Sequence, residues 1–467
     1  METICLQTLA AWCGGTLRGD PGYEVRELVR DSREAGPGCL FVAIKGERLD
    51  GHDFANDVLA KGAAVLSSKP ARELCPGGVP EGASLILVED TVKALGAIGR
   101  CYKQSMPPEL MTVGITGSVG KTSCKDMIAA ALSGGRKTLK TLGNFNNHIG
   151  VPLTLLRLDH EVQAAVIEMG MNHFGEIDYA ASLACPDMGV ITNVGTAHIE
   201  MLGSREGIRR AKLEMVPHLT RGPLLINGDD DMLMAVKDSL EVPVETFGFG
   251  THNDGVIRLA EPTPEAGMHM VMTYRGETYD LVVNTLGRHM AYNVIPAIMT
   301  AVHFGLSREE ILRGLASYEA TPHRLQRIPL ERYLVIDDTY NANPVSMCAA
   351  VDALTWIPGE ARRVAILGDM FELGDYTREG HLSVGHHLAE TEGVHVILTV
   401  GQAAAAIEEG YREKGGKQPC FHFDTKEDML KKILSIVHEN DIILLKASHG
   451  MQFSDIPERL SSLCKNA

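Results

Sequence analysis

The chain has 467 residues, too many for one ordinary hydrophobic core, and this length suggests about three domains of roughly 150 residues each. Its 60 acidic residues outnumber its 44 basic residues. The formal net charge of -16 would repel a polyphosphate backbone, so nucleic acid is not an expected partner.

The cysteines and the apolar segments indicate the compartment. The ten cysteines are scattered without a C-x-x-C pair, and no histidine cluster has zinc spacing, so neither a disulfide framework nor a structural metal is predicted. The N-terminus lacks a basic leader region, and no apolar run reaches the roughly 18 residues of a membrane span. We therefore expect a cytoplasmic protein that is not inserted in a membrane. Separately, we expect it to be a monomer.

The first 105 residues predict a small α/β domain. Short strand-like segments, "GCLFVAI" (38–44) and "ASLILVED" (83–90), are separated by helix-like stretches and by turns rich in glycine and proline. A linker should follow, because Pro107 and Pro108 in "YKQSMPPEL" oppose continued helix. The first domain is therefore expected to cover residues 1–105.

From residue 111 onward, short β-branched runs alternate with helical stretches. The strand candidates are 110–116, 164–170 and 188–195, and a helix is expected over 121–133. This alternation predicts a parallel sheet with helices on both faces. Between about residues 244 and 285 the apolar period becomes two, and "MHMVMTYRGETYDLVV" predicts a hairpin that turns at Gly276. We interpret this hairpin as an antiparallel extension of a central domain over 106–318.

A third α/β unit begins near Thr321, after a helical stretch over 291–305. Its strand candidates are 333–338, 362–370, 394–400 and 441–448. The fold class is therefore α/β with three domains: a small N-terminal α/β domain, a central parallel-sheet domain and a Rossmann-like C-terminal domain over 319–467.

The stretch "MTVGITGSVGKTS" (111–123) predicts a phosphate-binding loop. A strand ending at Thr116, a short flexible loop and a helix opening at Lys121 would direct backbone N-H groups and a positive helix end at a phosphate chain. Gly117 and Gly120 allow close backbone approach. The loop is shorter than G-x-x-x-x-G-K-[ST], because Ile115 stands where that pattern has its first glycine. The ordinary alternative is a glycine-rich turn that only caps a helix.

Four side chains near this loop are suited to ATP and Mg²⁺. Lys121 would reach the β- and γ-phosphates, and the Thr122 hydroxyl would bind Mg²⁺. Glu168 ends an apolar strand, where parallel sheets bind ligands. His198 follows another strand end and is a candidate metal ligand or phosphate contact, although a lone histidine is more often structural.

Taken in chain order, the motifs resemble the Mur ligase family of ATP-dependent amide-bond-forming enzymes, and the resemblance covers nearly the whole chain. That family uses the short loop T-G-[ST]-x-G-K-[ST], which matches 116–123. Five further segments resemble the members that join D-alanyl-D-alanine to UDP-N-acetylmuramoyl-tripeptide: "DSREAGPGCLFVAIKGERLDGHDF", "GNFNNHIGVPLTLL", "EMGMNHFGEI", "DDTYNANP" and "LGDMFELG". Siblings that add the third amino acid usually carry a D-Y-A-H-x-P type motif in place of "DDTYNANP".

The resemblance implies a peptidoglycan-precursor ligase that uses ATP and Mg²⁺. The substrate carboxylate would first form an acyl phosphate with loss of ADP, and the amine of the dipeptide would then displace phosphate. Because a carboxylate must approach the γ-phosphate, charge neutralisation is the main catalytic demand. The alternatives are a sibling ligase adding the third amino acid, a folylpolyglutamate-type ligase, or a nucleotide-dependent switch.

The same resemblance assigns expected roles to individual residues. Catalytic roles are expected for Lys121, Lys212, His198 and Glu168. Nucleotide contacts are expected at Thr116, Gly117, Ser118, Gly120, Lys121, Thr122, Ser123, Asn293, Arg324 and Asp338. Metal ligands are expected at Thr122, Glu168, His198 and Lys212, the last after carbamylation. Substrate contacts are expected at Ser32, Arg33, Lys45, Gly46, Asn144, Asn146, Asn147, Asn341 and Asn343.

Ordinary explanations compete with several of these roles. Lys212 lies beside the apolar positions of its helix and is also suited to be a snorkelling lysine. The asparagines are also suited to turns and helix caps, and Arg324 to a plain surface position. Two segments depart from the family pattern: "GRHMAYN" keeps Asn293 but has Met290 where an asparagine is expected, and "LLKASHGM" has Ala447 and His449 where glycine and arginine are expected.

Overall fold

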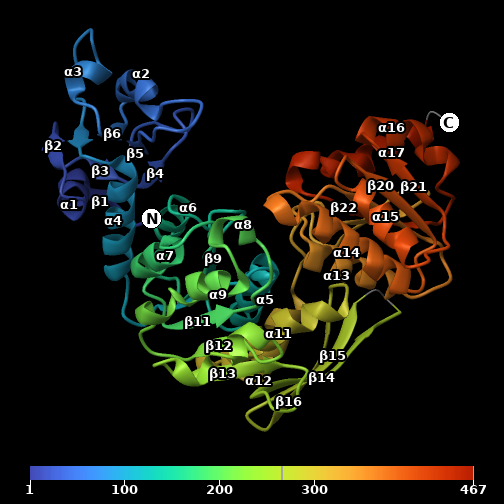
Figure 1. Ribbon diagram of the computed structural model, residues 1–467. Coiled ribbons are helices and arrows are strands. Elements are labelled where there is room, and N and C mark those ends of the chain that lie inside the picture. The colour runs from blue at the N-terminus through green and yellow to red at the C-terminus, as the bar shows by residue number, and fades with distance from the viewer. Residues whose placement is uncertain (265–266, 466–467) are drawn as a thin grey trace. The chain divides into compact units, whose positions relative to one another are not determined.

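The computed structural model describes residues 1–264 and 267–465 (Figure 1). These residues form two compact units, each built from separate stretches of the chain. The first unit contains Met1–Thr116, Arg136–Gly189 and Leu213–Gly222, and the second contains Gly117–Gly135, Val190–Lys212 and the chain from Pro223 onward. No helix in the described ranges is long and apolar enough to cross a membrane.

The N-terminal part of the first unit is the small α/β module expected from the sequence. A five-stranded sheet has the order β2-β7-β6-β5-β4 and is parallel except for β2. Its strands are β2 (Thr16–Arg18), β4 (Glu27–Val29), β5 (Cys39–Val42), β6 (Ala64–Ser67) and β7 (Leu85–Leu87). Beside them are the antiparallel pair β1 (Ile4–Cys5) and β3 (Glu24–Val25) and the helices α1 (Leu6–Trp12), α2 (Ala55–Ala60) and α3 (Ala71–Leu74).

Helix α4 (Thr91–Gln104) leads from this module to the linker before β8. Asp90 caps it by accepting hydrogen bonds from the Val92 and Lys93 backbone N-H groups. Two glycines of α4 allow other helices to approach closely: Gly99 faces Pro152 of α6 (Gly150–Leu155), and Gly96 faces Tyr179 of α7 (Glu176–Ala184). The linker expected at Pro107 and Pro108 is confirmed, because α4 ends before it.

The remaining core of the first unit is parallel. β8 (Met111–Thr116) pairs with β10 (Ala164–Glu168), which pairs with β9 (Thr138–Lys140). All five residues of β10 are buried, as expected for a parallel strand that is covered on both faces. β11 (Met188–Ile191) begins in this unit and leads into the second.

The second unit begins with α5 (Lys121–Ser133), whose bounds match the predicted helix. It continues with α8 (Ile199–Leu202), α9 (Arg205–Leu213), α10 (Asp231–Met234), α11 (Ala291–His303) and α12 (Arg308–Ala316). β12 (Leu224–Asn227) and β13 (Val244–Gly248) are parallel, and β14 (Gly255–Pro262) pairs in parallel with β13. β14 then starts the antiparallel extension with β15 (Met268–Tyr274) and β16 (Glu277–Val283).

The predicted hairpin is confirmed at its predicted turn. Tyr274 pairs with Glu277, and the two residues between them, Arg275 (φ 48) and Gly276 (φ 79), both have positive φ. This is the pattern of a type I′ turn, which matches the twist of the flanking strands and favours glycine at its second central position.

The C-terminal module is the Rossmann-like domain expected from the sequence (Figure 1, orange to red). Its six-stranded sheet has the order β17-β18-β22-β19-β20-β21, and only β17 is antiparallel. The strands are β17 (Gln326–Pro329), β18 (Leu334–Asp337), β19 (Arg363–Gly368), β20 (Val396–Val400), β21 (Cys420–Phe423) and β22 (Ile442–Lys446). α13 (Pro344–Thr355), α14 (Thr377–Glu390) and α15 (Ala405–Glu413) cover one apolar face, and α16 (Lys426–Lys432) and α17 (Ile456–Lys465) cover the other.

Short 3₁₀ turns complete the described secondary structure. They are η1 (Gly51–Phe54), η2 (Val216–His218), η3 (Lys237–Ser239), η4 (Arg288–Met290), η5 (Gly374–Tyr376), η6 (Ile433–Ser435), η7 (His449–Met451) and η8 (Phe453–Asp455). Among them, η4 matters for function because it begins directly before α11.

The contact between α4 and α7 generates a stability prediction. A Cβ on Gly96 would lie 1.9 Å from the Tyr179 hydroxyl oxygen, which is buried and has no hydrogen-bond partner in the described part of the chain. Tyr179→Phe should raise the free energy of unfolding by about 1 kcal/mol because it removes an unsatisfied polar atom. Gly96→Ala should lower it by about 1 to 3 kcal/mol through overpacking.

Urea unfolding of both single variants and the double variant measures this coupling. The double variant should be more stable than the sum of the two single effects, because the clashing oxygen is gone. Strict additivity would contradict the proposed contact.

Candidate functional site

The loop Gly117–Gly120 has the geometry of a phosphate cradle. It follows the buried strand β8, and Gly120 (φ 83) is the N-cap residue of α5. A Cβ on Gly117 would lie 1.8 Å from Thr192 Oγ1, so only glycine fits this close approach. The loop therefore presents backbone N-H groups at the positive end of a thirteen-residue helix.

The residues after β11 hold this loop in place. The Asn193 side chain accepts a hydrogen bond from Val119 N (2.9 Å) and donates one to Val119 O (2.9 Å). Thr192 Oγ1 also donates to Val119 O (2.6 Å), and Ser118 Oγ accepts from Gly195 N (2.9 Å). The sequence analysis missed Thr192 and Asn193 as functional residues. The signal that points to them is their position directly after a buried strand.

Lys121 and Thr122 open α5 as expected. The Lys121 ammonium donates to the carbonyl oxygens of Gly117 (2.8 Å) and Ser118 (3.4 Å), so its charge lies across the loop. Thr122 is 7% exposed, and its Oγ1 accepts a hydrogen bond from Arg324 Nη2 at 3.0 Å. Arg324 is therefore not a plain surface residue. It brings a guanidinium group from the segment before β17 to the first turn of α5.

The local backbone conformation and a stacked aromatic ring fix the position of the Arg324 side chain. His323 (φ 62) and Leu325 (φ 49) flank it in the left-handed region, which costs about 1 to 3 kcal/mol for each non-glycine residue. The Arg324 guanidinium carbon lies 4.1 Å from the centre of the Tyr340 ring, a cation–π contact. Arg324 Nε is buried and has no hydrogen-bond partner among the residues that the structure describes. A buried, unsatisfied donor beside a phosphate loop fits an anionic ligand.

The "DDTYNANP" segment is built around a buried lysine. Lys446 is 2% exposed and donates to Asp338 Oδ2 (2.6 Å) and to the Asn341 carbonyl oxygen (3.0 Å). Asp338 Oδ1 in turn accepts from Leu325 N at 3.2 Å, so this carboxylate also fixes the Arg324 segment. Asn343 caps α13 together with Ser346, as the ordinary explanation for an asparagine there requires.

Lys212 on α9 is a buried cation beside another cation. Its side chain is 1% exposed, and within the described part of the chain its ammonium has no hydrogen bond or ion pair. Burial lowers the pKa of Lys212 well below its usual value, and the positive charge of Lys121 lowers it further. The apolar positions predicted correctly that Lys212 lies at the buried face. The lowered pKa favours a neutral, nucleophilic amine.

His198 and the C-terminal module meet within the second unit. His198 (φ 64) is the N-cap residue of α8, and its Nδ1 lies 3.7 Å from Glu372 Oε2. Glu372 belongs to the "LGDMFELG" segment after β19. A Cβ on Gly374 in the same segment would lie 3.0 Å from the Glu200 side chain of α8. The segment predicted for function therefore contacts the loop that carries His198.

Several candidate residues gather around the start of α11. Asn293 is buried, and its Oδ1 would lie 3.1 Å from a Cβ on Gly120, so it faces the phosphate loop. Its Nδ2 donates to Met290 Sδ at 3.4 Å, a weak hydrogen bond. Nearby, the Arg288 guanidinium lies 3.9 Å from the centre of the Phe249 ring, and Tyr292 meets Phe249 edge to face. The sequence analysis missed this aromatic pair.

The first unit brings the candidate carboxylate and asparagines together. Glu168 is 1% exposed, and its Oε1 accepts a hydrogen bond from Asn146 Nδ2 at 2.8 Å. Asn147 Oδ1 accepts from Gly150 N (2.8 Å) at the start of α6, as a turn residue would. Asn144 contributes its carbonyl oxygen to Asn146 N (2.7 Å), and its side chain is exposed.

The N-terminal candidates lie on exposed turns of the same unit. Arg33 forms an ion pair with Asp31, and the Arg33 hydrogen bonds lower the pKa of Asp31 to about 2. The Ser32 carbonyl accepts from Lys61 Nζ (2.9 Å), and Gly46 N donates to the Leu49 carbonyl (2.9 Å) in the turn after Lys45. The guanidinium of the preceding Arg30 stacks on Phe145 at 5.1 Å, which links the "DSR" turn to the asparagine segment.

A phosphate loop between a parallel strand and a helix places the chain in the class of P-loop nucleotide enzymes. Comparison with known proteins is consistent with this class. The chain matches "Mur ligase family, catalytic domain" over residues 24–103, "Mur ligase middle domain" over 115–301 and "Mur ligase, glutamate ligase domain" over 323–449.

Full-length relatives agree with these matches. The UDP-N-acetylmuramoyl-tripeptide--D-alanyl-D-alanine ligase of Bacillus subtilis is 37% identical over 97% of this chain and 98% of its own length. The crystal structure of MurF from Acinetobacter baumannii has a TM-score of 0.89 and 32% identity, covering 99% of each chain. The MurF ligase of Thermotoga maritima in complex with ADP has a TM-score of 0.82 and 27% identity, covering 95% of this chain and 99% of its own. The chain belongs to the Mur ligase family and has its three-domain fold.

The burial of Lys212 generates a prediction about stability and pH. Because its pKa is lowered on folding, the unfolded chain binds the proton more tightly, and stability rises with pH until the unfolded value of 10.5 is passed. Lys212→Met should therefore raise the free energy of unfolding by about 1 to 3 kcal/mol at pH 7 and by less at pH 10.

Urea unfolding at both pH values in carbon dioxide-free buffer measures this difference. Lys414→Met, at an exposed lysine, is the matched control and should change stability little at either pH. An equal gain for Lys212→Met at pH 7 and pH 10 would contradict the lowered pKa.

Proposed function

We propose that the protein is an ATP- and Mg²⁺-dependent ligase that joins D-alanyl-D-alanine to UDP-N-acetylmuramoyl-tripeptide. The products would be the UDP-muramoyl-pentapeptide precursor of peptidoglycan, ADP and phosphate. The observation that carries this proposal is the near full-length similarity to ligases of that name, 37% over 97% of the chain in one case. The "DDTYNANP" segment, which runs from the last residue of β18 to the first residue of α13, supports the dipeptide ligase over a sibling that adds the third amino acid.

Each of the three proposed domains has its own binding role. Residues 1–105 bind the UDP part of the substrate, 106–318 bind ATP, and 319–467 bind the incoming dipeptide and complete the ATP site. The family matches over 24–103, 115–301 and 323–449 fall within these limits. Because the nucleotide substrates are found inside the cell, we place the enzyme in the cytoplasm. We also expect it to be a monomer.

Charge neutralisation is the main task of the ATP site. The terminal carboxylate oxygen of the tripeptide attacks the γ-phosphorus, and the bond from that phosphorus to the β,γ-bridging oxygen breaks as ADP leaves. Lys121 and Arg324 are the cations that offset the charge of the reacting phosphates. The contact between Arg324 and Thr122 supports this role, because it holds the guanidinium at the first turn of α5. The loop N-H groups and Ser118, Gly120 and Ser123 bind the remaining phosphate oxygens.

The second step forms the amide. The amine of the dipeptide attacks the acyl-phosphate carbon, and the tetrahedral intermediate then expels phosphate as its carbon–oxygen bond breaks. The proton lost by the amine passes to phosphate or solvent. Asn341 and Asn343 are proposed to contact the dipeptide, with Asn343 also capping α13. Water must be kept from the acyl phosphate during this step, which favours a closed site.

The donor set fits Mg²⁺. The Thr122 hydroxyl and the buried Glu168 carboxylate are hard oxygen donors, which this ion prefers, and His198 contributes an imidazole nitrogen. The described residues contain no group of three or more His, Cys, Asp or Glu side chains at metal distance, as expected if phosphate oxygens supply much of the coordination. Bound there, Mg²⁺ would neutralise charge on the phosphate oxygens.

Lys212 is proposed to act as its carbamate. A neutral amine is the form that reacts with carbon dioxide, and burial lowers the pKa of Lys212 in that direction. The amine nitrogen attacks the carbon of carbon dioxide, a nitrogen–carbon bond forms as one carbon–oxygen π bond opens, and one proton is released. The neutral amine beside Lys121 thereby becomes an anion. The product would be attracted to Lys121 instead of repelled.

The remaining candidate residues are given proposed roles from their positions in the chain. Asn293, Arg288, Phe249 and Tyr292 are proposed to surround the adenine base, and Asp338 to contact the ribose or phosphates. Ser32, Arg33, Lys45 and Gly46 are proposed to bind the uridine nucleotide. Asn144, Asn146 and Asn147 are proposed to bind the muramoyl-peptide, supported by the Asn146 contact with Glu168.

The test of this function is ADP release by the purified protein with Mg-ATP and UDP-N-acetylmuramoyl-tripeptide, with and without D-alanyl-D-alanine. Release should depend on both substrates, and mass spectrometry should detect the pentapeptide product. Parallel reactions with free L-lysine or diaminopimelate and the UDP-dipeptide test the sibling activity. Slow ADP release that is indifferent to every substrate would replace the ligase with a nucleotide-dependent switch.

Lys121→Ala should reduce ADP formation by at least about 100-fold, because the cation that lies across the phosphate loop is removed. Calorimetry should show nearly unchanged binding of the UDP substrate, whose proposed contacts lie in the other unit. Loss of UDP-substrate binding in this variant would contradict the proposed division of labour.

A further inference from the structure

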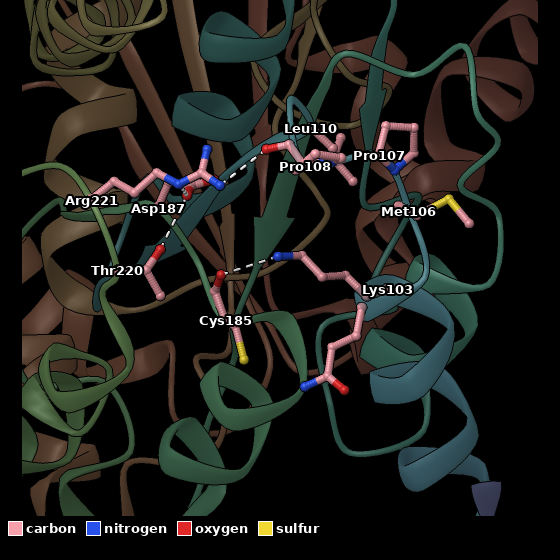
Figure 2. A pocket seen from close by; sticks show the side chains of 10 residues that line it. Lys103, Met106, Pro107, Pro108, Leu110, Cys185, Asp187, Thr220 and Arg221 are labelled. Atoms are coloured by element: carbon pink, nitrogen blue, oxygen red, sulfur yellow. Dashed lines mark hydrogen bonds and ion pairs between the residues drawn. The ribbon is translucent and has the colours of Figure 1, made fainter.

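A cavity of about 290 Å³ lies in the first unit, and none of the residues that line it has been assigned a role above (Figure 2). Its walls are the last turn of α4, the linker that follows, and the segments before β11 and after η2. The lining residues are Lys103, Gln104, Met106, Pro107, Pro108, Leu110, Cys185, Asp187, Thr220 and Arg221. Leu110 and Asp187 directly precede β8 and β11, so the cavity lies at the amino ends of these two strands.

Two cations reach into this cavity from opposite walls (Figure 2). Lys103 Nζ donates to the Cys185 carbonyl at 3.3 Å, and Arg221 Nη2 donates to the Pro108 carbonyl at 3.0 Å. The contact of Lys103 is at the long end for a hydrogen bond, and a neutral carbonyl is a weaker acceptor than an anion. No carboxylate in the described ranges pairs with Lys103, although the chain as a whole carries a net charge of -16.

The single carboxylate of the lining is already satisfied. Asp187 is 3% exposed and accepts hydrogen bonds from Thr112 N (2.6 Å) and Thr220 Oγ1 (3.1 Å), and it forms an ion pair with Arg221 Nε (3.1 Å). It therefore offsets the charge of Arg221 and leaves the charge of Lys103 without a counterpart. The polar side of the cavity is positive and rich in donors.

The other side of the cavity is apolar. Met106 and Leu110 are 7% and 5% exposed and close it from the linker side, and Pro107 and Pro108 stiffen that wall. The volume is at the lower end for small-molecule sites. An occupant must therefore be small, carry a negative head group for Lys103 and Arg221, and have a short apolar body for the linker wall.

We propose that this cavity is a binding site for a small amphiphilic anion, with one carboxylate or phosphate-monoester head and a short hydrocarbon tail. The head takes the donors that Lys103 and Arg221 now share with backbone carbonyls, and the tail contacts Met106 and Leu110. Binding would replace the contact of Lys103 with the Cys185 carbonyl and the contact of Arg221 with the Pro108 carbonyl of the linker. The linker joins the N-terminal module to β8, so occupancy would alter how firmly that module is held.

Cys185 supplies a direct probe, because it lines the cavity and is half-buried. The rate of its alkylation by iodoacetamide is measured by peptide mass spectrometry at constant ionic strength. Butyrate and butyl phosphate should slow this rate in a saturable way, and butanol and butylammonium should not. Cys348, in the other unit, is the internal reference and should react at an unchanged rate.

Variants separate binding from folding. Lys103→Met should weaken protection by about tenfold, because it removes the unmatched charge. Lys103→Arg should retain protection, and Lys93→Met, at an exposed lysine of the same helix, should leave it unchanged. Thermal unfolding of each variant shows that it is folded before the protection is compared.

Each outcome of the alkylation assay either supports the proposed site or contradicts it. Protection by butyrate alone or by butyl phosphate alone supports the site and identifies the head group. Equal protection by butanol, or protection by butyrate that survives in Lys103→Met, would overturn the anionic assignment. Protection by acetate and inorganic phosphate that matches their butyl analogues would overturn the amphiphilic class. Because the assay contains neither ATP nor UDP substrate, it succeeds or fails independently of the proposed ligase activity.

Discussion

The hydrogen bond from Arg324 to Thr122 joins the two parts of the second unit on which the proposed nucleotide site depends. One partner opens the helix after the phosphate loop, and the other precedes the first strand of the C-terminal sheet. This hydrogen bond can contribute to function only if the guanidinium is held firmly. The residues on either side of Arg324 have left-handed backbone conformations, which cost free energy and hold the side chain in this position. Tyr340 covers its flat face, and Asp338 anchors the adjoining backbone. Preorganisation of this kind lets a cation act on phosphate without reorganising during the reaction.

The same unit also contains Lys212, a buried lysine whose positively charged form is disfavoured. Lys212 lies close enough to Lys121 for the two charges to repel, and neither burial nor this neighbour favours its ammonium form. Stability alone would select an apolar residue at a position that is 1% exposed. A lysine that persists there is best explained by chemistry of its neutral amine. The buried Lys446 is a useful contrast, because Asp338 pairs with it and fixes the substrate-side segment instead.

The sequence predicted the strands and the phosphate loop well, and the contacts around the loop poorly. Parallel strands such as β10 are continuous apolar runs, and the helix after the loop opens at a glycine and a lysine. Both features can therefore be recognised from short stretches of the sequence. Asn193 and Phe249 are ordinary loop residues whose roles appear only when distant segments meet. Asn343 illustrates the opposite difficulty, since its motif position suggested a ligand contact and the structure also gives it a capping bond. Propensity and pattern describe neighbours in sequence, whereas a site is made by neighbours in space.

Met290 shows how a departure from the family pattern acts through its neighbours. An asparagine at this position would offer a donor and an acceptor, whereas the Met290 thioether is only a weak acceptor. The structure uses it as one, because Asn293 Nδ2 donates to Met290 Sδ at 3.4 Å. A bond this weak leaves the Asn293 amide more easily recruited by a base, and the adjacent Arg288, Phe249 and Tyr292 add stacking surface that does not depend on hydrogen-bond pattern. Recognition of the base in this chain should therefore rest more on stacking and less on a fixed pair of amides.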